Sequence, residues 1–319
     1  MREESVLVTG GAGFIGSHLV DALLSQGNSV HVLDNLSNGK TEHIDRWLQQ
    51  PNFTFTKDDL LTKTDWTDIN DCRTVIHLAA NPEVRVGSSK PEIHFQQNLQ
   101  ATFNLLEATR KKGKVSTCVF ASSSTVYGDA TGIPTPEDYA PLQPISVYGA
   151  TKLACEALIT AYAHTYDFNT IILRLANIIG PRSNHGVIID LIQKLRMNQK
   201  TLEILGDGTQ SKSYLLVDDC VEAFLLALSK SKEKITVLNV GSEDMVDVKK
   251  IASIIIEEMG LHDTQFTYTG GVDGGRGWKG DVKTMLLDVK HLRALGWRPK
   301  YTSDQAVRVT ANRLLNSKQ

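Results

Sequence analysis

A glycine-rich segment near the N-terminus constrains the fold of this chain more than any other feature. The segment is Thr9-Gly10-Gly11-Ala12-Gly13-Phe14-Ile15-Gly16, and it joins the apolar run 5–9 to a helical pattern that extends to Gln26. A tight turn from a strand into a helix needs glycine where the backbone turns sharply and where helix and strand approach closely. The segment therefore predicts the first βα unit of a parallel sheet.

The rest of the first half repeats this alternation of short apolar runs and longer helical patterns. Such runs indicate strands that are buried on both faces and joined by right-handed helical crossovers. The predicted strands are 5–9, 29–33, 52–56, 74–78, 116–121 and 170–175, and the predicted helices include 14–26, 92–112 and 147–166. We predict an α/β fold, a doubly wound parallel sheet of the Rossmann type with a smaller α/β lobe.

The glycine spacing also predicts a ligand. Gly10-x-x-Gly13-x-x-Gly16 is close to the dinucleotide-binding fingerprint, with one extra residue between the first two glycines. N–H groups at the start of the following helix are suited to bind a pyrophosphate. The second strand ends in Asp34, whose carboxylate would accept hydrogen bonds from both ribose hydroxyls of NAD and repel the 2′-phosphate of NADP. The alternative interpretation is that Asp34 only forms a turn; we predict NAD as the cofactor.

The regular alternation of predicted strands and helices ends after residue 176, where short strands and glycine turns replace it. At roughly 150 residues per domain, a chain of 319 residues fits two domains. We expect residues 1–176 to form the NAD-binding Rossmann domain and residues 177–319 to form mainly a substrate-binding lobe. The helix predicted at 217–229 is expected to pack back on the first domain.

Composition excludes several classes of protein. The formal net charge is −2, which argues against nucleic-acid binding, and no apolar run is long enough to predict a membrane span. Cys72, Cys118, Cys155 and Cys220 are far apart and form no C-x-x-C pair, which indicates a reduced, cytoplasmic protein without disulfides. The histidines show no H-E-x-x-H spacing, so we predict no metal site.

A tyrosine and a lysine predict the catalytic chemistry. Tyr148 and Lys152 are four positions apart at the start of a long helix, so they share one face. A lysine ammonium and the positive charge of NAD⁺ would lower the pKa of the phenol, which would then serve as a general base toward a sugar hydroxyl. Ser123, at the end of the preceding strand, would meet the same substrate oxygen. Taken alone, the Tyr–Lys spacing is also compatible with chance.

Several motifs occur together in a fixed order. They are T-G-x-x-G-x-x-G, Leu78-Ala79-Ala80, Ser122-Ser123-Ser124-Thr125-Val126-Tyr127-Gly128, Y-x-x-x-K and the segment Arg174–Arg182. With these motifs the chain resembles the extended short-chain dehydrogenases/reductases, and most of all the NAD-dependent sugar-nucleotide epimerases related to UDP-glucose 4-epimerase. The resemblance covers essentially the whole chain.

The resemblance implies a set of site residues. The cofactor contacts that it implies are Gly10, Gly13, Phe14, Ile15, Gly16, Asp34, Asn35, Ser37, Asn38, Gly39, Asp59, Leu60, Leu78, Ala79, Ala80, Tyr148 and Lys152. It makes Ser123, Tyr148 and Lys152 catalytic. The substrate contacts that it implies are Ser123, Asn177, Lys212 and Arg276. For Asp59, the cap of a helix is the alternative role.

Departures from the family pattern argue against two reactions of the family and change the expected diphosphate site. Dehydratases and decarboxylases of this type place acidic residues after the serine motif, whereas this chain has Ser124 and Thr125, which argues against both reactions. Lys212-Ser213 stands where the family has Arg-Asp, and Trp278 stands at the arginine of an R-x-G-D motif, with Arg276 close by. A diphosphate would thus meet a point charge at Lys212 in place of a bidentate guanidinium.

The expected function is NAD-dependent 4-epimerisation of a nucleoside-diphosphate hexose, of the UDP-glucose/UDP-galactose type, through a transient 4-keto sugar. One alternative is an NAD-linked nucleotide-sugar dehydrogenase or reductase. Another is a non-catalytic NAD-sensing protein, which would have no need of Ser123, Tyr148 and Lys152 together.

The two long helices also predict an assembly. Both predicted helices, 92–112 and 147–166, carry apolar or small residues outside the single stripe that would cover the sheet. The family pairs these helices with their symmetry mates, so the resemblance implies a homodimer. Burial of both helices within one chain is the alternative.

Overall fold

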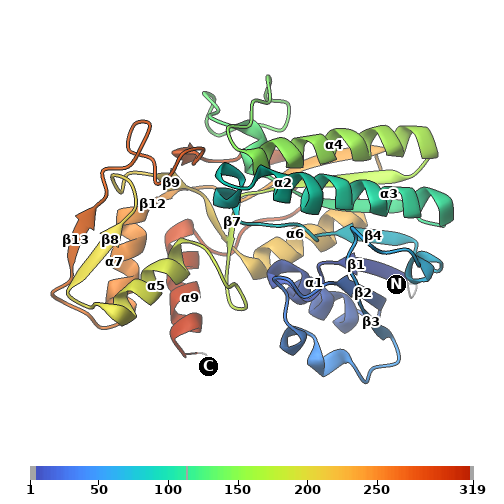
Figure 1. The fold of residues 1–319 in the computed structure, drawn as a ribbon, viewed down its shortest axis with the longest axis horizontal. Helices are drawn as coiled ribbons and strands as arrows, with labels where there is room; N and C mark the ends of the chain where they lie inside the picture. Colours follow the sequence, from blue (N-terminus) through green and yellow to red (C-terminus); the bar gives the residue numbers. More distant parts are fainter. Residues whose placement is uncertain (1–4, 113, 317–319) are drawn as a thin grey trace.

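Seven parallel strands form one central sheet in the computed structural model, which describes residues 5–112 and 114–316 (Figure 1). In spatial order the strands are β3 (Phe53–Lys57), β2 (Ser29–Asp34), β1 (Ser5–Thr9), β4 (Thr74–His77), β5 (Thr117–Ser123), β6 (Asn169–Leu175) and β11 (Ile235–Val240). The order reverses beside β1, as in a doubly wound fold. The predicted Rossmann-type fold class is confirmed.

The strands are apolar because both faces of the sheet are covered. Val8 of β1 pairs with Val32 of β2 and with Ile76 of β4, and all three are buried. In β5 the side chains alternate, so that Val119 packs with the core on one face and Phe120 with the core on the other. This two-sided burial explains the near-continuous apolar runs in the sequence.

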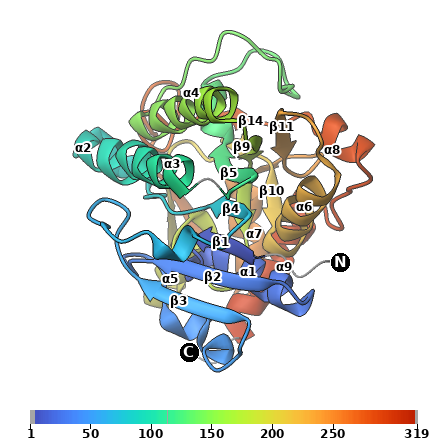
Figure 2. The ribbon, with the colours of Figure 1, turned by 90° about the vertical axis from the view of Figure 1, so that its right-hand side faces the viewer.

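Two pairs of helices cover the sheet (Figure 2). The helices α1 (Phe14–Ser25) and α6 (Val217–Lys230) contact each other on one face, and α3 (Ala101–Lys112) and α4 (Val147–Tyr166) lie side by side on the other. The helix predicted at 92–112 begins one residue earlier, as α2 (Pro91–His94), and continues through one π-helical segment, Phe95–Gln100, into α3.

Short 3₁₀ segments connect the larger elements of this part of the chain. They are Thr41–His43, Asp45–Trp47, Thr67–Ile69, Val84–Ser88 and Ser124–Tyr127. Two of them border the site described below, because Val84–Ser88 contacts the start of α4 and Ser124–Tyr127 follows β5 directly.

A smaller lobe with its own core lies beside the sheet (Figure 1). Its helices are α5 (Val187–Met197), α7 (Val248–Glu258) and α9 (Ser303–Asn316). Its strand pairs are β7 (Asn177–Ile179) with β10 (Tyr214–Leu216), β8 (Thr201–Ile204) with β13 (Gln265–Tyr268), and β9 (Ser211–Lys212) with both β12 (Val246–Asp247) and β14 (Thr284–Met285). Leu191, Ile251 and Val307 bring α5, α7 and α9 together in its core.

Parts of the second half of the chain pack with the first half around the central sheet. Helix α6 contacts α1 and β6, β11 forms the edge of the central sheet beside β6, and α8 (Lys290–Ala294) contacts β11. The division near residue 176 stays a prediction; besides the expected helix, β11 and α8 also lie with the first half. Over the residues that the structure describes, no helix is both long and apolar enough to cross a membrane.

Candidate active site

The carboxyl ends of the central strands open into one cavity of about 680 Å³, which the small lobe closes from the other side. Ligands of doubly wound folds bind at this edge of the sheet. All but one of the predicted site residues line this cavity, namely Gly10, Gly13, Phe14, Ile15, Gly16, Asp34, Asn35, Ser37, Asn38, Gly39, Asp59, Leu60, Leu78, Ala79, Ala80, Ser123, Tyr148, Lys152, Asn177 and Lys212. The exception is Arg276. Their roles stay predictions.

The glycine turn leaves bare backbone at the start of α1. Gly10 has a φ of +73°, and a Cβ there would lie 2.7 Å from the Ala79 nitrogen. A Cβ at Gly16 would lie 2.1 Å from the Gly10 carbonyl oxygen. No other residue fits these positions without moving the backbone. The cradle that results, at a helix N-terminus lining the cavity, fits the pyrophosphate of a dinucleotide.

Asp34 ends β2 at the cavity. We call the region of the cavity that is lined by Asp34, Asn35, Asp59 and Leu60 the adenosine end. The Asp34 carboxylate accepts hydrogen bonds from the Ala12 N–H at 3.0 Å and from the Leu36 N–H at 2.8 Å. Burial raises its pKa. Asp34 thus forms a turn, as in the alternative interpretation, and also lines the cavity.

Asp59 makes two contacts through its carboxylate. Its Oδ1 accepts a hydrogen bond from the Leu61 N–H at 2.9 Å, which closes a turn; no helix begins at Asp59, so the alternative role as a helix cap is wrong. Its Oδ2 accepts one from the Asn35 amide at 3.0 Å, and this bond joins the two loops of the adenosine end.

His77 is a buried residue, directly before the cavity-lining Leu78, that the sequence analysis did not single out. It is fully buried at the end of β4, where Nδ1 lies 2.7 Å from the Thr9 hydroxyl and Nε2 lies 2.9 Å from the Thr102 hydroxyl. Burial lowers the pKa of His77 to about 3, so the ring is neutral. His77 therefore ties the end of β4, directly before Leu78 and Ala79, to β1 and α3. Its position directly before the Leu-Ala-Ala motif was the available signal.

Tyr148 lies in the first turn of α4, half-buried at the cavity. The Ser146 hydroxyl caps this helix by accepting a hydrogen bond from the Gly149 N–H at 3.1 Å. Burial raises the pKa of Tyr148 to about 12, and a side-chain hydrogen bond with Ser123 acts in the opposite direction. The protein groups alone therefore raise the pKa of Tyr148, and do not lower it as the sequence analysis expected.

Lys152 is buried one turn further along α4. Its Nζ donates a hydrogen bond of 2.8 Å to the Ala121 carbonyl oxygen and lies 5.9 Å from the centroid of the Tyr148 ring. Burial lowers the pKa of Lys152 to about 8, so the ammonium stays mostly protonated at neutral pH. The helical spacing thus places a positive charge close to the phenol.

Thr125 is a second residue that sequence reasoning did not assign to the site. Its backbone N–H and its hydroxyl donate to Ser123 Oγ at 3.2 and 3.0 Å. Because a hydroxyl oxygen accepts two hydrogen bonds and donates one, the Ser123 hydrogen is left to another acceptor. The position of Thr125 after the serine motif was the signal for it.

A buried polar network lies behind these residues. Glu156 accepts a hydrogen bond of 2.5 Å from the Ser122 hydroxyl and forms an ion pair of 2.7 Å with Arg174. Arg174 in turn donates to the Tyr127 hydroxyl at 2.9 Å. The network joins α4, β5 and β6 where Lys152 is anchored, and its buried charges are paired.

The predicted substrate residues separate into two groups. At the cavity, Asn177 donates from its side-chain amide to the Ser213 carbonyl at 3.1 Å, and Lys212 Nζ lies 2.6 Å from Asp281 Oδ1. Arg276 instead forms a bidentate ion pair with Asp129, with both contacts at 2.9 Å.

Trp278, which stands at the family's arginine position, also lines the cavity. Lys212 Nζ and the Arg85 guanidinium carbon lie over its ring, 5.7 and 5.5 Å from the centroid. Both cations also line the cavity, and each is paired with a carboxylate, Lys212 with Asp281 and Arg85 with Glu83.

Comparison with known proteins gives consistent similarities. Residues 6–241 match the NAD dependent epimerase/dehydratase family. The UDP-glucose 4-epimerase of Mycolicibacterium smegmatis is 31% identical over 320 residues, which cover 98% of this chain and 99% of that one. A crystal structure of a UDP-galactose 4-epimerase is 45% identical with a TM-score of 0.85, covering 98% of both chains. The UDP-glucuronic acid 4-epimerase of Bacillus cereus, solved with UDP-glucuronic acid and NAD, is 30% identical with a TM-score of 0.87, covering 98% and 99%.

Proposed function

The chain belongs to the NAD dependent epimerase/dehydratase family, and we propose that it catalyses the NAD-dependent 4-epimerisation of a UDP-hexose, such as UDP-glucose or UDP-galactose, through a transient 4-keto sugar. The family membership confirms the resemblance inferred from the motifs and the prediction of NAD as cofactor. The observation that carries the proposal is that Ser123, Tyr148 and Lys152 line the same cavity as the glycine turn.

Tyr148 is the proposed base for the proton of the sugar O4. When bound, oxidised NAD supplies a hydride acceptor for C4 and a positive charge beside the phenol. Because burial raises the pKa of Tyr148 to about 12, the phenolate forms at neutral pH only where positive charge stabilises it. The Lys152 ammonium provides part of that charge and stays protonated below a pKa of about 8.

Ser123 is the proposed hydrogen-bond partner of the reacting oxygen. Thr125 donates twice to Ser123 Oγ, so the Ser123 hydroxyl hydrogen is available to the Tyr148 oxygen or to the sugar O4. Thr125 has no acidic hydrogen suited to general acid catalysis at neutral pH. This absence of a carboxylate beside Ser123 favours simple oxidation and reduction at C4 over elimination of water.

Lys212 and Asn177 are proposed to bind the substrate diphosphate. Lys212 contributes a cation at the cavity, and the Asn177 amide retains one N–H beyond its bond to Ser213. Arg276 remains a proposed contact that would first have to release Asp129. UDP as the nucleotide is supported by the names of the similar epimerases, which act on UDP-glucose, UDP-galactose or UDP-glucuronic acid.

Incubation of the purified protein with a panel of nucleotide sugars tests the proposal. We expect NMR to show interconversion of UDP-glucose and UDP-galactose with no net change in absorbance at 340 nm. A nucleotide-sugar dehydrogenase or reductase would change that absorbance in proportion to product. A cofactor-sensing protein would bind NAD and convert none of the sugars, and conversion of UDP-glucuronic acid alone would move the substrate to an acidic sugar.

We further propose a cytoplasmic homodimer built on the outer faces of the two long predicted helices, 92–112 and 147–166, which the structure forms as α2, the segment Phe95–Gln100 and α3, and as α4. Phe95 and Phe103 are exposed large apolar side chains, and Ala157 and Ala161 expose small side chains on α4. An apolar face that a monomer leaves in water is typical of an interface between copies. The four cysteines are free and buried, which fits the reducing cytoplasm.

A further inference from the structure

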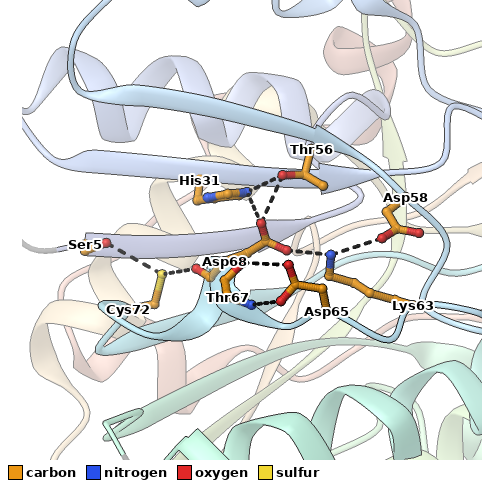
Figure 3. Close-up of polar contacts among 9 residues, drawn as sticks. All are labelled: Ser5, His31, Thr56, Asp58, Lys63, Asp65, Thr67, Asp68 and Cys72. Carbon is orange, nitrogen blue, oxygen red and sulfur yellow. Dashed lines mark hydrogen bonds and ion pairs between the residues drawn. The ribbon is translucent and has the colours of Figure 1, made fainter.

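Lys63 is a buried lysine below the adenosine end of the cavity. Its side chain is 3% exposed, and its Nζ lies 3.0 Å from Asp58 Oδ2 and 2.7 Å from Asp68 Oδ2 (Figure 3). Burial alone would lower the pKa of Lys63, but the bonds to Asp68 and Asp58 outweigh it and raise the pKa. The ammonium therefore stays charged at neutral pH and holds the two carboxylates together.

Asp68 is anchored to the edge of the central sheet. Its Oδ1 accepts a hydrogen bond from the Thr56 hydroxyl of β3 at 3.0 Å, and the same oxygen lies 3.2 Å from His31 Nε2 of β2 (Figure 3). Asp68 itself belongs to the 3₁₀ segment Thr67–Ile69. Lys63 thus connects the loop after β3 to a carboxylate that two strands hold in place.

The loop after β3 also forms a wall of the cavity. Residues 58–61 line the cavity at the adenosine end. Asp58 Oδ1 accepts a hydrogen bond from the Asp59 N–H at 2.8 Å, and the Lys63 backbone N–H donates to the Asp59 carbonyl at 2.8 Å. Asp59 then accepts from the Asn35 amide at 3.0 Å. Lys63 therefore sets the position of Asp59 from both ends of this short loop.

We propose that Lys63, held by Asp68, is a positioning residue that fixes the wall formed by residues 58–61 and thereby slows the release of NAD. Neither Lys63 nor Asp68 lines the cavity, so an effect of either on NAD acts through this wall. The inference rests on the proposed function, because an epimerase has to retain its reduced cofactor until the hydride returns to the sugar. A loosely held wall would raise the dissociation rate of NAD, since a binding site needs its supporting residues to be rigid.

Two variants of the full chain test the proposal. Lys63→Met removes the ammonium. Asp68→Asn keeps the shape of the Asp68 side chain, which anchors Lys63, but removes its negative charge. Lys114→Met is the matched control, because Lys114 pairs with Asp71 at 3.0 Å on the exposed surface. The measurement is the rate at which bound NAD leaves the protein on dilution. We expect release about tenfold faster in both test variants, equivalent to about 1.4 kcal/mol, with an unchanged rate in the control.

Equal release rates for Lys63→Met and Lys114→Met would overturn the proposal. So would a loss of stability of the cofactor-free protein without faster release of NAD, because that result assigns Lys63 to folding alone. If Lys63→Met does not fold, Asp68→Asn decides by the same measurement. NAD release requires no sugar, so the result stands apart from whether the enzyme epimerises UDP-hexoses.

Discussion

The ammonium of Lys152 donates a hydrogen bond of 2.8 Å to the carbonyl oxygen of Ala121, near the end of the strand that carries Ser123. Lys152 and Tyr148 both lie on α4, and the bond to Ala121 holds the end of the lysine side chain in place. The ammonium therefore has a fixed position relative to Tyr148. Lys152 retains two further N–H groups for a ligand at the cavity. The proposed chemistry depends on this arrangement, because the charge that stabilises the Tyr148 phenolate has to be held near it.

Replacement of Tyr148 by Phe removes the proposed base but keeps the ring. We expect Tyr148→Phe to bind NAD as the wild type does and to lose about two to four powers of ten in kcat. Initial rates and NAD titration measure the two effects separately. Tyr268→Phe, at an exposed tyrosine outside the cavity, is the control. Turnover near the wild-type value would remove Tyr148 from the mechanism.

The carboxylate of Asp34 is expected to set the preference for NAD over NADP. Asp34→Asn keeps the shape of the side chain but removes the negative charge and one of the two acceptor oxygens, so only one of the Ala12 and Leu36 N–H groups keeps its bond. We expect weaker discrimination against NADP, because repulsion of the 2′-phosphate is lost. The ratio of the two dissociation constants is the measurement. An unchanged ratio would leave Asp34 as a turn residue only.

Lys212 and Arg276 are expected to differ in their effect on substrate binding. Lys212→Met should raise KM for the UDP-sugar about 10- to 100-fold, as expected for the loss of one charged hydrogen bond. Arg276→Met should change KM far less, because Lys212 lines the cavity whereas Arg276 does not. Steady-state kinetics of both variants check this. Similar increases in KM would place both side chains on the diphosphate.

His77 is expected to make the protein less stable in acid. Its pKa is about 3 in the folded protein and near 6.5 in the unfolded chain, so below pH 6.5 the unfolded chain binds the extra proton. The free energy of unfolding should therefore fall as the pH is lowered from about 6.5 to about 3. The slope from this residue is at most about 1.4 kcal/mol per pH unit. Urea unfolding at several pH values should show a smaller slope in His77→Asn, and an equal slope would contradict the assignment.

The proposed dimer interface is open to disruption by charge. Ala157→Glu places a carboxylate on the exposed face of α4, and we expect it to shift the protein from dimer to monomer. Light scattering at micromolar concentration measures the mass. Ala294→Glu, at an exposed alanine on α8, is the matched control. A wild-type mass of 35 kDa would refute the dimer, and a dimeric Ala157→Glu would move the interface elsewhere.

Six of the seven strands of the central sheet and the glycine turn were predictable because they depend on local patterns, whereas the edge strand β11 was not predicted. Apolar runs such as the one that ends at Thr9 are buried on both faces wherever the sheet is placed. The close approach at Gly16 is set by residues within the same turn, and the helical spacing of Tyr148 and Lys152 brings them to one face. For these features the sequence was sufficient, and the predicted bounds differ from the structure by at most a few residues.

Tertiary structure decided which charges and polar groups meet. Arg276 and Asp129 are 147 positions apart, and no spacing in the sequence indicates that they form an ion pair. The burial of His77 and the bonds of Lys63 to Asp68 depend in the same way on segments that only folding brings together. The physical reason is that the pKa and the partner of a charged group depend on its surroundings in space, whereas the patterns in a sequence describe neighbours along the chain.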